Sequence, residues 1–151
     1  MAITKLDAAG IAMMIAFEGC ILHPYRDQVG IPTIGIGCTY YENGVKVTMD
    51  DPAITQERAN ELFTNIGTVY SNPVHFWTVP ILNQNQFNAL FSFCYNVGTG
   101  GFKGSSVLRL VNQNITDERL QAAFLLWDKA DGRVIDDLVN RRKKEYEIFI
   151  S

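Results

Sequence analysis

Two carboxylates and a hydroxyl stand close together early in the chain. Asp27 follows Glu18 after eight intervening residues, and Thr33 follows Asp27 after five more. Glycines and Pro32 divide this stretch into loop and strand, which present side chains rather than burying a long element. Two carboxylates and a hydroxyl near one cleft are suited to acid/base hydrolysis of an acetal. Nine residues of extended chain span about 30 Å, so the spacing allows the carboxylates to meet without requiring it.

Glu18 is expected at the end of a helix. A helix over residues 4–18 is predicted because apolar and small residues recur at intervals of three and four: Leu6, Ala9, Gly10, Met13, Met14 and Phe17. Thr4 is the expected N-cap, with Asp7 completing a weak capping box, and Gly19 suits the position after the helix. The negative end of the helix dipole and partial burial would make Glu18 hold its proton more readily, as a general acid must. An ordinary solvated glutamate is the alternative.

The same stretch carries a longer pattern of fixed spacing. Its members are Glu18, Gly19, Tyr25, Asp27, Gly30, Thr33, Ile34, Gly35 and Gly37. This pattern resembles that of the phage-type lysozymes (endolysins; muramidases of the glycoside hydrolase family 24 type), which cleave the glycan strands of bacterial peptidoglycan. One departure is Cys38, where the family often has a histidine.

The resemblance extends over nearly the whole chain. The segment 86–98 resembles the central helix of the family. Gly101-Phe102, Ser105-Ser106, Trp127 and the segment 140–145 resemble the remainder of the family pattern, up to its closing helix. The family often has Gly-Leu before its Asn-Arg-Arg, whereas Asp137-Leu138 stands here, so the start of the last helix is expected to differ.

Composition narrows the class of protein. A chain of 151 residues suits one domain with its own core. The net charge of −3 disfavours a nucleic-acid binder, and the basic run Arg141–Lys144 is typical of a solvated helix face. No stretch approaches the roughly 20 apolar residues of a membrane span, and the N-terminus is a poor signal peptide. Three cysteines (Cys20, Cys38 and Cys94) have no metal-type spacing and suggest reduced thiols.

Turn and cap signals divide the rest of the chain. Asn43-Gly44 between strand-forming residues predicts a hairpin in a small β region over about 20–50. A helix is expected from Thr55 to just before Pro73, and Asn83 with Gln86 forms a capping box for the next. Short helices come after it, one of them capped by Thr116, with a turn at Asp131-Gly132 before the last.

The resemblance implies an α+β, mainly helical fold with two lobes flanking a cleft. One lysozyme domain would cover residues 1–151, with a small β-hairpin lobe over about 19–54 and a connecting helix over about 55–72. The helical lobe would comprise about 73–151 together with the N-terminal helix 4–18.

The resemblance also assigns roles to residues. Glu18 would protonate the glycosidic oxygen, Asp27 would stay ionised and direct a water, and Thr33 would hold that water. Substrate-lining candidates are Tyr25, Tyr95, Asn96 and Arg141, although core packing is an alternative for either tyrosine. Arg141 could also pair with Glu18 across the cleft, which would favour the ionised form of Glu18 and so oppose the effect of the helix end on its protonation.

The function expected on this basis is a muramidase that cleaves the β-1,4 bond between N-acetylmuramic acid and N-acetylglucosamine with inversion. We expect a monomer without cofactor, metal, nucleic-acid partner or membrane insertion. It would be made in the host cytoplasm and act on the wall after release in bacteriophage lysis. Two alternatives stay open: a secreted antibacterial toxin of the same chemistry, and a non-catalytic peptidoglycan-binding module.

Overall fold

Residues 2–151 are described by the structure, a computed structural model. The chain divides into two compact units. Ile11–Thr68 forms one, which we call the hairpin unit. The segment up to Gly10 together with Val69–Ser151 forms the other, which we call the helical unit. The helical unit is therefore discontinuous in sequence.

Helix α1 (Ala8–Glu18) begins later than the sequence predicted. Asp7 directly precedes it, and the Asp7 Oδ1 accepts a hydrogen bond of 2.9 Å from the backbone N–H of Gly10. Thr4 as the cap is wrong, because this carboxylate accepts from a free N–H group of the first turn from a position three residues further on. The end of the helix agrees with the prediction. Gly19 has φ +80° and donates its N–H to the Ile15 carbonyl at 2.7 Å.

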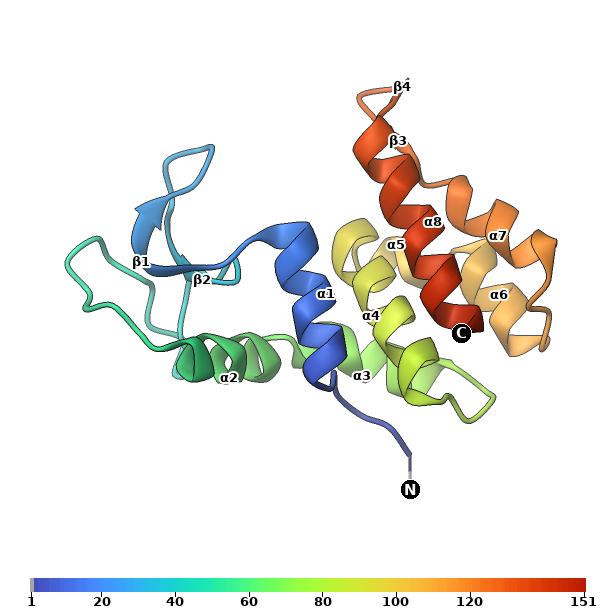
Figure 1. Ribbon diagram of the computed structural model, residues 1–151, viewed down its shortest axis with the longest axis horizontal. Helices are drawn as coiled ribbons and strands as arrows, with labels where there is room; N and C mark the ends of the chain where they lie inside the picture. The colour runs from blue at the N-terminus through green and yellow to red at the C-terminus, as the bar shows by residue number, and fades with distance from the viewer. Residues whose placement is uncertain (1) are drawn as a thin grey trace. The chain divides into compact units, whose positions relative to one another are not determined.

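A two-stranded antiparallel sheet follows α1 in the hairpin unit (Figure 1). Strand β1 (Ile21–Arg26) pairs with β2 (Pro32–Gly35), so that Tyr25 lies opposite Thr33. The predicted Asn43-Gly44 turn is present further on: Tyr41 N–H donates to the Val45 carbonyl at 2.9 Å, and Gly44 has φ +82°. Helix α2 (Gln56–Ile66) completes the unit. The fully buried side chains include Ile34, Ile36, Ala59 and Leu62.

The single helix predicted over 55–72 is two helices. Helix α2 ends at Ile66, and α3 (Thr68–Trp77) continues through Pro73. The expected end before Pro73 is wrong, because Gly67 makes the break six residues earlier, donating its N–H to the Phe63 carbonyl at 2.8 Å. Proline removes one helical hydrogen bond, but the next residue, Val74, is completely buried, and that packing favours continuation of the helix.

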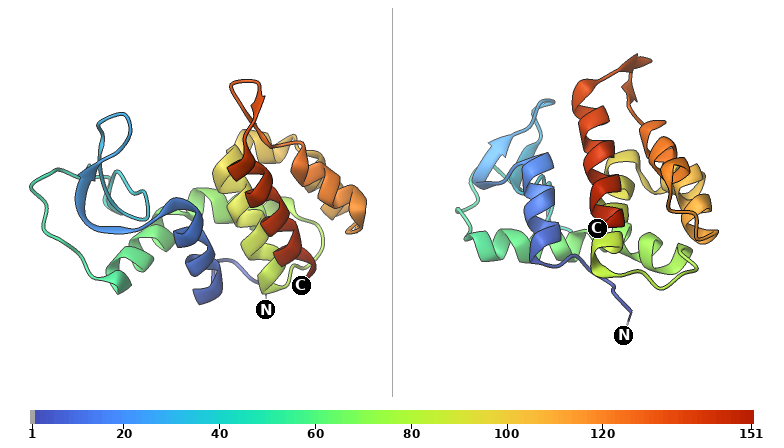
Figure 2. Two further views of the ribbon diagram at one scale, coloured as in Figure 1. Left: turned by 45° about the horizontal axis from the view of Figure 1, so that its top comes forward. Right: turned by 45° about the vertical axis from the view of Figure 1, so that its right-hand side comes forward.

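The helical unit is built around α4 (Gln84–Val97) and α8 (Asp136–Ile150), which pack side by side in all three views (Figures 1 and 2). The predicted capping box of α4 is present, with Asn83 and Gln86 bonded reciprocally. In chain order, three helices follow α4 and precede α8: α5 (Thr99–Lys103), α6 (Ser106–Asn112) and α7 (Glu118–Leu125). Asp117 rather than the predicted Thr116 caps α7, accepting from the Arg119 N–H.

An aromatic core fills the helical unit. The Phe93 ring meets Phe124 edge-to-face at 5.2 Å between centroids and Trp127 at 5.9 Å. Burial of one such ring stabilises the fold by about 1.5–3 kcal/mol. The predicted Asp131-Gly132 turn joins two short strands, β3 (Lys129–Ala130) and β4 (Arg133–Val134).

The predicted class, α+β and mainly helical, agrees with these elements. None of the helices described for residues 2–151 has the length and apolar character that crossing a bilayer requires.

Candidate active site

Glu18 is the last residue of α1. The structure leaves it exposed, so the expected partial burial is wrong. The position itself explains this, since the chain turns at Gly19 and no further helical turn covers the side chain.

Asp27 directly follows β1 and organises the turn of the hairpin. Its Oδ1 accepts hydrogen bonds from the backbone N–H groups of Val29 and Ile31, both at 2.9 Å. The backbone closes the same turn, with the Gly30 N–H donating to the Asp27 carbonyl at 3.0 Å. No hydrogen bond from residues 2–151 reaches the Asp27 Oδ2. The carboxylate is therefore fixed through one oxygen and can act through the other.

Thr33 lies on β2 and is 2% exposed. Its hydroxyl donates a hydrogen bond of 2.8 Å to the Ile31 carbonyl. A hydroxyl has one proton and two lone pairs, so this bond leaves Thr33 with acceptor capacity only. Its packing and this bond together hold the oxygen in place.

The register of the hairpin brings three predicted residues to one face. Tyr25 pairs with Thr33, and the Asp27 N–H donates to the Ile31 carbonyl at 3.0 Å. Side chains alternate between the faces of a strand, so Tyr25, Asp27 and Thr33 share a face. Asp27 and Thr33 are diagonal neighbours, about 7–8 Å apart between backbones.

Tyr25 is a neutral member of this face. Burial raises the pKa of its phenol, and the nearby Asp27 carboxylate raises it further. Both causes keep the phenol protonated at neutral pH, so it can donate as well as accept a hydrogen bond.

The comparison with protein families decides what kind of protein carries this face. The model of the family described as phage lysozyme matches residues 15–145, which include Glu18, Asp27 and Thr33. The chain belongs to the phage lysozyme family. It is accordingly a lysozyme-type glycoside hydrolase, and peptidoglycan is the substrate of that family.

Known proteins and solved structures match the chain over nearly its whole length. The endolysin of Salmonella phage P22 is 37% identical over 147 residues, covering 97% of this chain and 99% of that protein. The crystal structure of a point mutant of P22 lysozyme has a TM-score of 0.88 at 36% identity, covering 99% of this chain and 100% of that one. The muramidase domain of SpmX from Asticaccaulis excentricus has a TM-score of 0.77 at 29% identity, covering 99% of both chains.

The remaining site candidates of this phage lysozyme lie in the helical unit. Tyr95 belongs to an aromatic cluster, with its ring 4.9 Å from that of Tyr70 and 6.3 Å from that of Phe91. Packing in the core therefore accounts for much of its environment. Asn96 is exposed at the end of α4, whereas Arg141 on α8 is only 7% exposed.

The basic run Arg141–Lys144 is not the solvated helix face that the sequence suggested. Arg142 is completely buried and Arg141 nearly so, while Lys143 and Lys144 are exposed. The reason is Glu145, also completely buried, whose carboxylate both arginines contact. Burial raises the pKa of Glu145, and the charges of Arg142 and Arg141 act against that effect.

Sequence reasoning missed Arg142, Glu145 and Ser92, which join Asn96 and Arg141 in one cluster. The available signal was the spacing, because residues three and four apart on a helix are neighbours. Among residues 2–151, no group of three or more His, Cys, Asp or Glu side chains could hold a metal ion.

Proposed function

We propose that this phage lysozyme cleaves the β-1,4 bond between N-acetylmuramic acid and N-acetylglucosamine during bacteriophage-induced host lysis, with inversion at the anomeric carbon. Membership of the family supports the reaction class. The hydrogen bonds of Asp27 and Thr33 within the hairpin support the mechanism.

Glu18 acts as the general acid. Its proton passes to the glycosidic oxygen as the bond from that oxygen to the anomeric carbon breaks. The exposed end of α1 gives a bulky glycan access to the carboxyl. The Asp27 carboxylate stabilises the positive charge that develops on the sugar ring.

The observation that carries the inverting mechanism is the hydrogen bond from the Thr33 hydroxyl to the Ile31 carbonyl. Because that bond uses the only proton of the hydroxyl, a water near Thr33 must donate to Oγ1. The same water can donate its second proton to the unoccupied Oδ2 of Asp27. Its oxygen lone pair then stays free to attack the anomeric carbon while Asp27 takes up the proton.

A water between Asp27 and the sugar needs space. Inverting enzymes hold their two carboxyl groups about 6.5–9.5 Å apart, whereas a nucleophilic carboxylate lies about 5–5.5 Å from the acid. A threonine that can only accept suits the first arrangement, since a direct attack by Asp27 requires no positioned water in the first step.

Proton NMR of the freshly released reducing ends tests this mechanism. We expect the α anomer to form first from a β-linked glycan, before mutarotation mixes the two. A β anomer as the first product would make Asp27 a nucleophile and leave Thr33 without the role proposed.

The substrate contacts proposed for the remaining candidates come from their chemistry. Tyr25 offers a neutral phenol on the Asp27 face, and Asn96 offers an exposed amide. Tyr95 and Arg141 would contribute an aromatic edge and a guanidinium. We further propose that the enzyme acts as a monomer without a cofactor, on the wall, after release from the cytoplasm in which it is made.

A further inference from the structure

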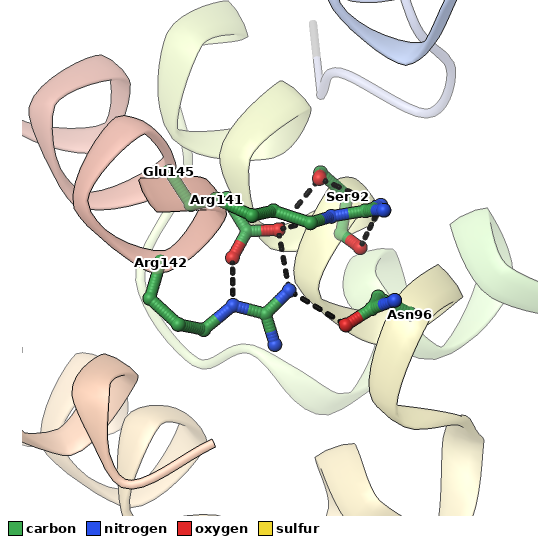
Figure 3. Close-up of polar contacts among 5 residues, drawn as sticks. All are labelled: Ser92, Asn96, Arg141, Arg142 and Glu145. Atoms are coloured by element: carbon green, nitrogen blue, oxygen red, sulfur yellow. Dashed lines mark hydrogen bonds and ion pairs between the residues drawn. The ribbon is translucent and has the colours of Figure 1, made fainter. Parts of the chain in front are cut away.

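The contact between α4 and α8 holds a polar cluster that the proposed mechanism does not use. Figure 3 shows its five members: Ser92 and Asn96 from α4, and Arg141, Arg142 and Glu145 from α8. Arg142 and Glu145 are completely buried, and Ser92 is too. Charged side chains in such a position require dense pairing, because removing a charge from water costs several kcal/mol.

Glu145 lies at the centre of the cluster (Figure 3). The Ser92 hydroxyl donates to its Oε2 at 2.6 Å, and the Arg142 Nη2 donates to the same oxygen at 3.3 Å. The Arg142 Nε lies 2.7 Å from the Glu145 Oε1, an ion pair whose N–H does not point along the contact. The Arg142 guanidinium also lies 5.1 Å from the centre of the Phe93 ring. Arg142 is thus fixed in position and direction.

Asn96 receives its orientation from Arg142. The Arg142 Nη2 donates to the Asn96 Oδ1 at 2.8 Å. A guanidinium has only donors, so an amide beside it must present its oxygen and turn its NH₂ group the other way. Asn96 is exposed, and its Nδ2 has no hydrogen-bond partner among residues 2–151. Arg142, on the buried side, therefore fixes the orientation of the Asn96 amide, so that the end of α4 presents the NH₂ group as a hydrogen-bond donor.

We propose that Arg142, held by Glu145, is a positioning residue that fixes Asn96 as a hydrogen-bond donor to the N-acetyl carbonyl oxygen of a sugar in the substrate. This inference rests on the proposed function, which supplies an N-acetylated glycan. The amide carbonyl is a strong neutral acceptor on such a sugar, and an NH₂ group of fixed direction selects it over an amine in the same place.

A purely structural role for the cluster predicts something different. If Arg142 served only to join α8 to α4, substitutions at Asn96 would change stability without changing which sugar is preferred. Asn96→Asp separates the two roles, because an aspartate still accepts from Arg142 but offers a carboxylate where the amide offered a donor.

The experiment compares reducing-end release from N-acetylated peptidoglycan and from the same wall after chemical de-N-acetylation. For Asn96→Asp we expect KM on the acetylated wall to rise about tenfold, the equivalent of one hydrogen bond, with kcat within about twofold. On the de-N-acetylated wall we expect no loss, since a carboxylate attracts the exposed amine. The preference for the acetylated wall, as the ratio of kcat/KM values, should fall at least tenfold.

Matched variants complete the test. Asn85→Asp makes the same change on an exposed position of α4, where the Asn85 amide donates to the Ser151 hydroxyl, and should leave the preference unchanged. Arg142→Lys keeps a donor-only cation beside Asn96 and should keep the preference within about twofold of wild type. Arg142→Met frees the amide to rotate and should reduce the preference severalfold. If Arg142→Met does not fold, the results for Asn96→Asp and Arg142→Lys still test the inference.

An unchanged preference in Asn96→Asp would overturn the inference, as would a loss of preference in Arg142→Lys equal to that in Asn96→Asp. Neither result bears on the proposed glycosidase activity. That proposal fails separately, if wild-type enzyme releases no reducing ends from the acetylated wall.

Discussion

Glu42 should make the stability of the hairpin unit depend on acid. The Arg58 guanidinium donates two hydrogen bonds of 2.7 Å to its carboxylate, and the Asn65 amide donates one of 3.0 Å. These bonds hold the pKa of Glu42 at about 2, against an ordinary value of 4.5. At 1.36 kcal/mol for each pKa unit, the full shift corresponds to about 3.4 kcal/mol. The two side chains are 36% and 31% exposed, so solvent screening reduces the expected contribution to about 1 kcal/mol.

The direction of the pH dependence is set by the lowered pKa. The unfolded chain binds a proton at Glu42 below about pH 4.5, whereas the folded chain resists it down to about pH 2. The contribution is therefore complete above pH 4.5 and is lost as the pH falls to 2. Glu42→Gln should lower the free energy of unfolding by about 1 kcal/mol at pH 7, and the difference from wild type should vanish by about pH 2.

Urea unfolding followed by circular dichroism between pH 7 and pH 2 measures this difference. Subtracting the free energy of unfolding of the variant from that of wild type at each pH cancels the titration of all other groups. Glu147→Gln on the exposed side of α8 is the matched control, with an expected change within about 0.5 kcal/mol. A difference for Glu42→Gln that is absent at pH 7, or that stays constant to pH 2, would refute the reasoning.

The remaining predictions concern the chemistry and the packing of α1. Glu18→Gln should fold normally and lose about 10²–10⁴-fold of lytic activity in a turbidity assay, and near-wild-type lysis would remove Glu18 from the mechanism. Activity should survive both EDTA and strong reductant, so loss with chelator that one metal restores would contradict the hydrolytic scheme. Gly10→Ala should lower the thermal midpoint. A Cβ there would lie 2.6 Å from the Asn88 Oδ1 and 2.9 Å from the Leu6 Cδ2. Such overpacking costs about 1–3 kcal/mol, and over most of that range the cost exceeds the roughly 1 kcal/mol that alanine contributes to a helix. An unchanged midpoint would mean that Asn88 moves aside freely.

The local signals in the sequence were the most reliable guide to the fold. Asn83 and Gln86 predicted a capping box, and Gly19 and Asn43-Gly44 predicted turns, because each depends only on neighbouring residues. The prediction of a cap residue failed where two candidates competed, as at Thr4 and Asp7, since either side chain can accept from a free N–H. Pro73 misled because the packing of α3 is not visible in a local pattern.

The candidate site was predictable only in part. The motif that carries Glu18, Asp27 and Thr33 could be found from its spacing, and the hairpin register brings Thr33 to the face of Asp27. No local pattern indicated that the Thr33 proton is committed to Ile31, because that bond depends on the geometry of the folded strand. The burial of Arg142 was likewise invisible, since it depends on a contact with α4, 46 residues earlier in the chain.

The discontinuous helical unit constrains how the protein is synthesised. Asp7 accepts a hydrogen bond from the Asn88 amide, 81 residues further along, and the Lys5 carbonyl accepts one from Gln84. A ribosome adds about 5–20 residues each second, so the N-terminal segment waits about 4–16 s for its partner. By then the whole hairpin unit, with Glu18, Asp27 and Thr33, has been translated. A nascent chain that stalls before α4 therefore carries the acid, the second carboxylate and the threonine, but lacks the helix against which its first residues are to be anchored.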